Sequence, residues 1–342
     1  MSVIYGKVRI HGDAGQTITI TTPKGTTQIV QTTGQNFTDI ALVGMEEYNF
    51  NNGYRNEDII LNVNDFKEID MPFRLLLKKI PYEFYNGSVV VFNNEIHILG
   101  CDSYSLRHYK FDGTNWVSVS TLPFQINGGN CKSTVVYQNE IHIFNNQQHY
   151  KFDGTDWISV STPPFSLARA ISVVYNNEIH VLGNFDSSYD KRHYKWNGSS
   201  WSSVSTLPYS TSNKSNAVVF NNEIHLLYGD SNKRHYKWNG SSWSSVSTLP
   251  FNFYYGCAVV YNNEIHIMGS SYYSSGYPYE TSHYKWNGSS WTSVSTLPYG
   301  LMYGSTVVSN DEIYILGTDK NSYRTYDAQW DGTSWTIGAN NN

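Results

Sequence analysis

One stretch of sixteen residues, HYKWNGSSWSSVSTLP, occurs at residues 193–208 and again without change at 235–250. A third copy at 283–298 differs only at Thr292. Six related units follow one another, each with a Glu-Ile pair and a Trp in the same places: Glu95, Glu140, Glu178, Glu223, Glu264 and Glu312, and Trp116, Trp157, Trp201, Trp243, Trp291 and Trp335. Neighbouring units are 38 to 48 residues apart, a period typical of repeated supersecondary structures packed against one another.

Each unit predicts four strands, named A to D here in chain order. In the third unit, strand A is the apolar run ISVVY at 171–175, and an Asn-Asn turn leads to strand B, EIHVL at 178–182. After a variable stretch, strand C (RHYKW, 192–196) and strand D (from Trp201) flank an Asn-Gly turn. Asn-Gly pairs suit tight hairpins, and the β-branched and aromatic residues beside them suit a pleated surface.

Strands A and B are apolar at nearly every position, which indicates a sheet covered on both faces. Four-stranded sheets stacked around an axis are covered in this way, so we predict an all-β, six-bladed propeller over residues 85–338, with a tail at 339–342. An open solenoid is the alternative, but it would expose a large apolar face at each end.

The repeats resemble the kelch family. The resemblance rests on the strand order, on a glycine after strand B, and on a Tyr that precedes the Trp by seven positions in five units: Tyr109, Tyr150, Tyr194, Tyr236 and Tyr284. It covers about residues 85–338 and implies a kelch-like propeller. The family's paired glycines are reduced here to one or none, and the sixth unit has Ala328 in place of the Tyr.

Residues 73–84 are predicted to be a linker or an extra strand. Ile80-Pro81-Tyr82 matches the Leu-Pro-Tyr that ends strand D, so this segment either clasps the last blade or is the exit strand of a first domain. We favour the second interpretation, because units one to six already contain four strands each.

Residues 1–72 lack the repeat and alternate apolar and polar residues over short spans such as KVRIHG and QTITITT, separated by turn residues. This pattern predicts a small antiparallel β-sandwich domain. The domain is similar to transthyretin-like or carboxypeptidase-regulatory-like modules, and its place before a Tyr-, Ser- and Asn-rich propeller resembles tail and virion-associated proteins of phages and prophages. The resemblance implies attachment to a virion or tail structural protein through residues 1–72.

The first residues, MSVIYGKVRI, lack the features of a signal peptide, so we expect synthesis in the bacterial cytoplasm and localisation in the virion. A net charge of −5 disfavours nucleic acid as a partner, and no apolar run of about 18 residues predicts membrane insertion. Cys101, Cys131 and Cys257 show no metal-binding spacing, and a bridge between Cys101 and Cys131 stays open.

Antiparallel order places the B-to-C and D-to-A connections at one face of the ring and the two hairpin turns at the other. The turns repeat, whereas the connections vary and are rich in aromatic residues. The ring after each Pro recurs, which predicts a structural role for Tyr82, Phe124, Phe165, Tyr209, Phe251 and Tyr299. Residues outside this recurrence are the candidate ligand-binding set: Tyr189, Phe253, Tyr254, Tyr255, Tyr272, Tyr273, Tyr277, Tyr279, Tyr303 and Arg324.

Tyr rings stack on sugar rings at small entropic cost and add a hydroxyl, so a cell-surface glycan is the predicted ligand. Ten of eleven histidines fall at two repeated positions on strands B and C, which predicts packing, with Glu/His pairs inside each blade, and neither metal nor cofactor. We therefore expect a non-enzymatic virion protein that binds host carbohydrate and has no catalytic residues. A carbohydrate-active enzyme of sialidase, mutarotase or oxidase type and a kelch protein-interaction scaffold are the alternatives.

Overall fold

The computed structural model describes residues 80, 84, 87–100, 106–113, 115–124, 133–167, 170–183, 191–212, 214–270, 281–319 and 325–338, with backbone alone at 270, 302 and 319, and the backbone of seven strands between residues 5 and 70. These described parts contain strands and turns and no helix. The chain divides into two compact units, Met1–Leu75 and Leu76–Asn342.

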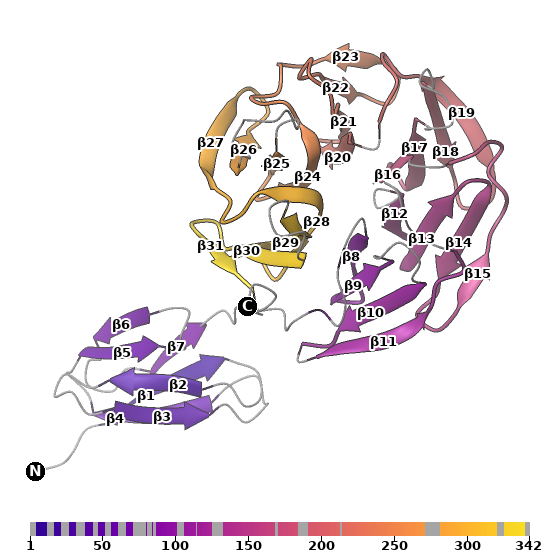
Figure 1. Cartoon of the computed structure of the whole chain (residues 1–342). Coiled ribbons are helices and arrows are strands. Elements are labelled where there is room, and N and C mark those ends of the chain that lie inside the picture. The colour runs from indigo at the N-terminus through magenta and orange to yellow at the C-terminus, as the bar shows by residue number, and fades with distance from the viewer. Residues whose placement is uncertain are drawn as a thin grey trace, which may run out of the picture. The chain divides into compact units, whose positions relative to one another are not determined.

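The second unit is a six-bladed β-propeller (Figure 1). Each blade is a four-stranded antiparallel sheet made from one contiguous segment, in the order A-B-C-D from the axis outward. Blades one to three contain β8 (Ser88–Phe92), β9 (Glu95–Leu99), β10 (Arg107–Phe111) and β11 (Trp116–Thr121); β12 (Thr134–Tyr137), β13 (Glu140–Asn145), β14 (Gln148–Phe152) and β15 (Trp157–Ser159); and β16 (Ile171–Tyr175), β17 (Glu178–Leu182), β18 (Arg192–Trp196) and β19 (Trp201–Thr206).

Blades four to six continue the same order. They contain β20 (Asn216–Phe220), β21 (Glu223–Leu227), β22 (His235–Trp238) and β23 (Trp243–Ser245); β24 (Tyr254–Tyr261), β25 (Glu264–Ser270), β26 (Ser282–Trp286) and β27 (Trp291–Thr296); and β28 (Leu301–Ser309), β29 (Glu312–Asp319), β30 (Thr325–Trp330) and β31 (Trp335–Ile337). The six inner strands contact one another in sequence, and β28 contacts β8, so the ring is closed. The predicted propeller is confirmed, and the open solenoid is not formed.

The turns between strands A and B have the backbone geometry that their sequence predicts. Both central residues have positive φ, for example 47° at Asn176 and 57° at Asn177, as a type I′ hairpin requires. In the turn between strands C and D, Gly198 has a φ of 98°, and the Asn197 side chain accepts the amide hydrogens of Ser199 and Ser200. The Asn-Gly-Ser triplets are therefore hairpin turns stabilised by their own side chains.

Hydrophobic side chains fill the spaces between neighbouring blades. Between blades three and four, for example, Val173 and Leu182 pack with Ile224, Leu226 and Trp238, all of them less than a tenth exposed. The outer strands are different, because in WSSVST of β19 most side chains are exposed or half-buried. The strongly apolar strands A and B are therefore the blade interiors, as predicted, and strand D is the rim.

Phe84, in the segment before blade one, clasps blade six through hydrogen bonds. Phe84 is fully buried, its amide donates to Thr325 Oγ1, and its carbonyl accepts a hydrogen bond from Thr318 Oγ1 at 3.2 Å. Ile80, which corresponds to the Leu of Leu-Pro in other units, is 3% exposed. The exit-strand interpretation that the sequence favoured therefore gives way to the clasp, because these apolar side chains find their buried positions in the propeller.

The described residues of the first unit form seven strands in two sheets. The sheet β4-β1-β7 contains β1 (Tyr5–His11), β4 (Thr38–Val43) and β7 (Phe66–Asp70), and the sheet β3-β2-β5-β6 contains β2 (Thr17–Thr21), β3 (Thr27–Gln31), β5 (Glu47–Asn51) and β6 (Asn56–Ile60). The strands β1 and β7 pair in parallel, whereas the sequence predicted a wholly antiparallel unit. Such a pairing joins distant segments, which short alternating patterns do not reveal.

Candidate functional site

The two faces of the propeller are defined by its connections. We call the face with the B-to-C and D-to-A connections the loop face, and the face with the two hairpin turns the turn face. Because every blade has four consecutive antiparallel strands, this division holds around the whole ring.

Four side chains from three consecutive D-to-A segments gather on the loop face. Lys214 leads into blade four, Tyr254 and Tyr255 begin β24, and Tyr303 lies near the start of β28. The ring centroids of Tyr255 and Tyr303 are 4.6 Å apart, and Lys214 Nζ lies 4.6 Å from the centroid of Tyr254 and 4.8 Å from that of Tyr255. All four side chains are partly exposed. We call this group the Tyr/Lys cluster.

The two facing tyrosines have a backbone conformation that bulky residues rarely adopt. The φ angle is 54° at Tyr255 and 53° at Tyr303, and each lies in a β-bulge where the register with the next strand shifts. A left-handed Tyr carries backbone strain, which the surrounding structure must hold in place. A β-bulge changes the direction in which a side chain points. The bulges at Tyr255 and Tyr303 lie at equivalent positions of two neighbouring blades.

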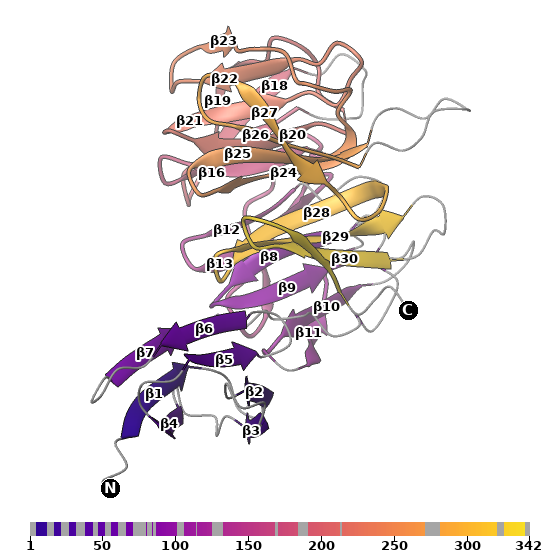
Figure 2. The ribbon, with the colours of Figure 1, turned by 90° about the vertical axis from the view of Figure 1, so that its left-hand side faces the viewer.

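Blades five and six extend further at the loop face than the other blades. Their strands A and B contain 8 and 7 residues in blade five (β24 and β25) and 9 and 8 in blade six (β28 and β29), whereas β16 and β17 contain 5 each. The strands β24 and β28 lie side by side (Figure 1 and Figure 2). The Tyr/Lys cluster therefore stands on an extended part of the ring.

An axial cavity of about 130 Å³ opens among the inner strands of all six blades. Its lining is small and mostly polar: Ser88, Val89, Thr134, Ile171, Ser172, Asn216, Ala217, Cys257, Ala258, Gly304, Ser305 and Thr306. Lys214, Tyr255 and Tyr303 each come one or two residues before a lining residue, so the Tyr/Lys cluster borders the cavity at the loop face. Apart from the Cys257 thiol, these described lining residues carry no ionisable group.

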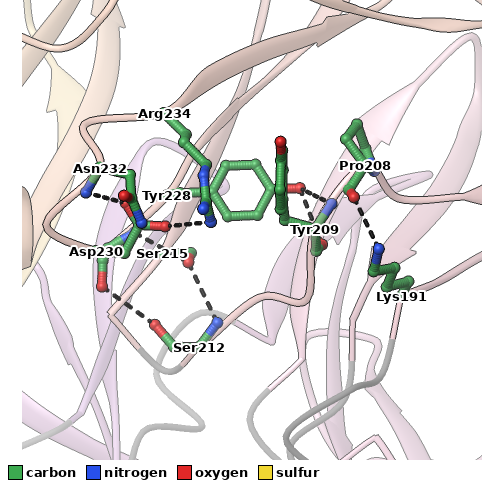
Figure 3. A network of polar contacts seen from close by, with 10 residues as sticks. Lys191, Pro208, Tyr209, Ser212, Ser215, Tyr228, Asp230, Asn232 and Arg234 are labelled. Atoms are coloured by element: carbon green, nitrogen blue, oxygen red, sulfur yellow. Dashed lines mark hydrogen bonds and ion pairs between the residues drawn. The ribbon is translucent and has the colours of Figure 1, made fainter.

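A second group of contacts lies at blade four (Figure 3). The Arg234 guanidinium lies 3.7 Å from the centroid of the Tyr209 ring and forms an ion pair with Asp230 at 2.9 Å. The Tyr228 hydroxyl donates to the Tyr209 carbonyl at 3.0 Å, and burial raises the pKa of Tyr228. Lys191 Nζ donates to the Pro208 carbonyl at 2.9 Å. Residues of blade four therefore hold the Tyr209 ring in place.

The rings after each Pro have the structural role that their recurrence predicts. Each of the five described rings packs on a Tyr of strand C, with centroids 4.3 to 5.9 Å apart: Phe124 on Tyr150, Phe165 on Tyr194, Tyr209 on Tyr236, Phe251 on Tyr284, and Tyr299 on Tyr326. Tyr82, the sixth such ring, lies outside the described residues.

Phe253 does not belong to the ligand-binding set. Its side chain has no exposed surface and packs in the core between blades four and five. The sequence interpretation treated it as non-recurring, but the same position is occupied by a fully buried apolar residue in three other segments: Phe84, Leu167 and Leu301. Its neighbours Tyr254 and Tyr255 point elsewhere because the bulge follows directly.

Six further predicted residues lie outside the described part of the chain: Tyr189, Tyr272, Tyr273, Tyr277, Tyr279 and Arg324. Cys101 and Cys131 also lie outside it, and Cys257 is buried. Sequence reasoning missed Lys214. The signal that could have found it is its repeat position, which it shares with Tyr255 and Tyr303.

The ten repeated histidines pair within their blades. Nδ1 of each strand-B His lies 2.7 to 2.8 Å from Nε2 of the strand-C His across from it: His97 and His108, His142 and His149, His180 and His193, His225 and His235, His266 and His283. Burial lowers the pKa of every one of them; it is about 4 for His97 and about 3 for His108. These imidazoles are therefore neutral at pH 7.

The Glu residues that were predicted to pair with the strand-B histidines pair instead with lysines of strand C. The Nζ-to-carboxylate distances are 2.8 to 2.9 Å for Lys110 and Glu95, Lys151 and Glu140, Lys195 and Glu178, Lys237 and Glu223, and Lys285 and Glu264. The reason is that an ammonium group forms a stronger, charge-assisted hydrogen bond with a carboxylate than a buried neutral imidazole does. Only His142 also lies near its Glu, at 3.7 Å, among the described ion pairs.

Within the described ranges, no group of three or more His, Cys, Asp or Glu side chains is arranged to hold a metal ion. The same residues contain no helix with the length and apolarity of a membrane span.

No family model matches the sequence, and no curated protein matches it. Solved structures do, among them one described as "Structure of YjhT", with a TM-score of 0.65 and 15% sequence identity. The match covers 77% of this chain and 99% of that chain. At this identity the likeness is one of fold, and it agrees with the six-bladed β-propeller of the structure.

Proposed function

We propose that the chain is a non-enzymatic binding protein that recognises host-surface carbohydrate through the loop face of blades four to six. The observation that supports this proposal is the Tyr/Lys cluster, where strained bulges hold Tyr255 and Tyr303 partly exposed beside a hydroxyl-lined cavity. Tyr rings stack on the C–H face of a sugar, and Ser, Thr and Asn side chains pair with its hydroxyls.

The cavity chemistry favours binding over catalysis. A carbohydrate-active enzyme needs a carboxylate pair or another acid and base at the reacting bond. The described residues that line the axial cavity supply hydroxyl, amide and small apolar groups, and Cys257 as their single ionisable side chain. The described lining of the axial cavity is therefore suited to binding a ligand.

We also propose that the chain is part of a virion. Residues 1–72 would attach the chain to a virion or tail structural protein, and the propeller would meet the host cell. This part is supported by the resemblance to phage and prophage tail proteins, which rests on the Tyr-, Ser- and Asn-rich composition and on the small domain before the propeller. Immunogold labelling of purified particles tests it. Absence of the chain from particles would overturn it without affecting carbohydrate binding.

A glycan array probed with the full chain tests the binding function. The informative variants are Tyr255→Asn and Tyr303→Asn, because Asn tolerates the left-handed conformation and because Asn86 occupies the equivalent sequence position before blade one. We expect carbohydrate binding to fall at least about tenfold while the melting temperature stays within a few degrees. Ile158→Asn, at a 42% exposed residue of β15, is the control that removes exposed apolar surface elsewhere.

The tyrosines of the connection before β26 form a separate arm of the test. Replacing Tyr272, Tyr273, Tyr277 and Tyr279 together by Ala asks whether this predicted set adds to binding. Unaltered binding in that variant would remove these residues from the site. Unaltered binding in both Asn variants, or turnover of a glycan by the purified chain, would overturn the proposed function.

A further inference from the structure

The loop face carries an unusual concentration of positive charge at blades three and four. Lys191 and Arg192 stand at the start of strand C in blade three, Lys233 and Arg234 stand at the equivalent positions in blade four, and Lys214 lies in the segment between them. These five described cations come from a chain whose net charge is −5.

Neutral carbonyl groups hold two of these cations, Lys191 and Lys233, in place. Lys191 and Lys233 donate to the carbonyls of Pro208 and Pro250, at 2.9 and 3.1 Å. Arg192 lies 5.0 Å from the centroid of the Phe165 ring. A carbonyl or an aromatic ring orients a cation without cancelling its charge, and an ammonium group that donates once retains two further donors.

Two further contacts complete the array. Lys214 lies over the Tyr254 and Tyr255 rings, and Arg234 stacks on Tyr209 while it pairs with Asp230. Lys214 is therefore both one of the five cations and a member of the Tyr/Lys cluster.

The same strands show the opposite balance at the turn face. There Lys195 and Lys237 form ion pairs with Glu178 and Glu223, and their charges are cancelled. In sequence, the B-to-C connections of blades three and four, counted through Arg192 at the start of β18, and the D-to-A connections that precede these blades contain six cations and three carboxylates: Arg169, Lys191, Arg192, Lys214, Lys233 and Arg234, and Asp186, Asp190 and Asp230. These connections of blades three and four therefore sum to +3, whereas the remainder of the chain sums to −8.

We propose that the carbohydrate is an acidic polysaccharide, whose anionic groups lie over the cations of blades three and four and whose sugar rings stack on the tyrosines of blades five and six. This inference rests on the proposed carbohydrate binding and specifies its ligand class. Positive groups held in advance lose little entropy on binding, and their field speeds encounter with a polyanion.

The experiment measures binding of the full chain to three probes of equal length: polygalacturonate oligomers, neutral dextran oligomers and single-stranded oligo-dT. The test variant is K191Q/K233Q, and the matched control is K195Q/K237Q, which removes the same charge from the same two blades at the turn face. We expect polygalacturonate to bind at least tenfold more tightly than dextran and to weaken as salt rises. We expect the test variant to lose about tenfold of that affinity and the control to lose none.

Three results would overturn the inference. Dextran binding as tightly as polygalacturonate would show that the charge of the ligand does not contribute to its affinity. Equal losses of affinity in the two double variants would show that the loop-face lysines do not contact the ligand. Oligo-dT binding as tightly as polygalacturonate would assign the surface to polyanions in general. A neutral glycan bound through Tyr255 and Tyr303 would sink this inference and leave the proposed function intact.

Discussion

The imidazole of His283 in blade five meets the indole of Trp330 in blade six at a right angle, with ring centroids 5.0 Å apart. The same imidazole lies 5.3 Å from Trp335 and is hydrogen-bonded to His266 in its own blade. Equivalent contacts join other strand-C histidines to the next blade: His108 to Phe152 and Trp157, His149 to Trp196 and Trp201, His193 to Trp238 and Trp243, and His235 to Trp286 and Trp291. Neutral histidines therefore join the blades.

We expect the propeller to unfold on mild acidification. Burial lowers the pKa of the ten paired histidines from the ordinary value of 6.5 to between about 2 and about 4, so the folded state binds fewer protons than the unfolded state below pH 6.5. Their contribution to stability is complete above pH 6.5 and is lost as the pH falls toward 4. Because all five histidine pairs contribute in the same direction, the free energy of unfolding falls steadily across that window.

Circular dichroism and tryptophan fluorescence across pH 7 to 3 measure this transition. The midpoint should lie between about pH 6 and 4, within the window that the lowered pKa values of the histidines define. A chain that keeps its full stability down to pH 4 would show that the histidine pairs do not govern acid unfolding.

The Tyr255 bulge depends on the glycine that follows it. A Cβ added to Gly256 would lie 2.5 Å from the Met268 carbonyl oxygen and 2.6 Å from the Phe253 ring, and the Gly256 carbonyl accepts a hydrogen bond from Asn216 at 2.9 Å. We expect Gly256→Ala to destabilise the chain by about 1–3 kcal/mol and to weaken carbohydrate binding, although it removes no ring.

The control for that variant is Gly113→Ala. Gly113 has a φ of 93° in a turn-face hairpin, and a Cβ there would meet nothing within 4 Å. Its replacement should cost about 1 kcal/mol through backbone strain and leave binding unchanged. If the two alanine variants bind carbohydrate equally well, the bulge does not position Tyr255 for a ligand.

The repeat predicted the blades well because it combines two local signals. Alternation and apolar runs set each strand, and Asn-Asn and Asn-Gly pairs set each turn, so the faces of the ring followed from antiparallel order alone. The prediction of Tyr254, Tyr255 and Tyr303 as candidate ligand-binding residues rests on the same ground, since they lie in connections that differ between units.

The rest depends on contacts between residues distant in sequence. Lys214 reaches Tyr254 and Tyr255 only because neighbouring blades meet at the axis, and no local pattern shows this. Phe253 was misplaced because its recurrence, four residues after the Leu of Leu-Pro, is hidden by variation between Phe and Leu. The strand-B and strand-C histidines pair with each other in a buried space between blades. The Glu-Ile-His pattern of strand B does not reveal that burial.

Phe84 should be essential for closing the ring, although it precedes the first repeat. It is fully buried and bonded through its backbone to Thr318 and Thr325 of blade six, so Phe84→Ala leaves a cavity at the seam between the first and last blades. We expect a loss of about 3–5 kcal/mol in the free energy of unfolding, measured by urea denaturation. Val117→Ala, at a 39% exposed position of β11, should cost less than about 1 kcal/mol. Equal losses in the two variants would mean that β28 and β8 hold the ring closed without the clasp.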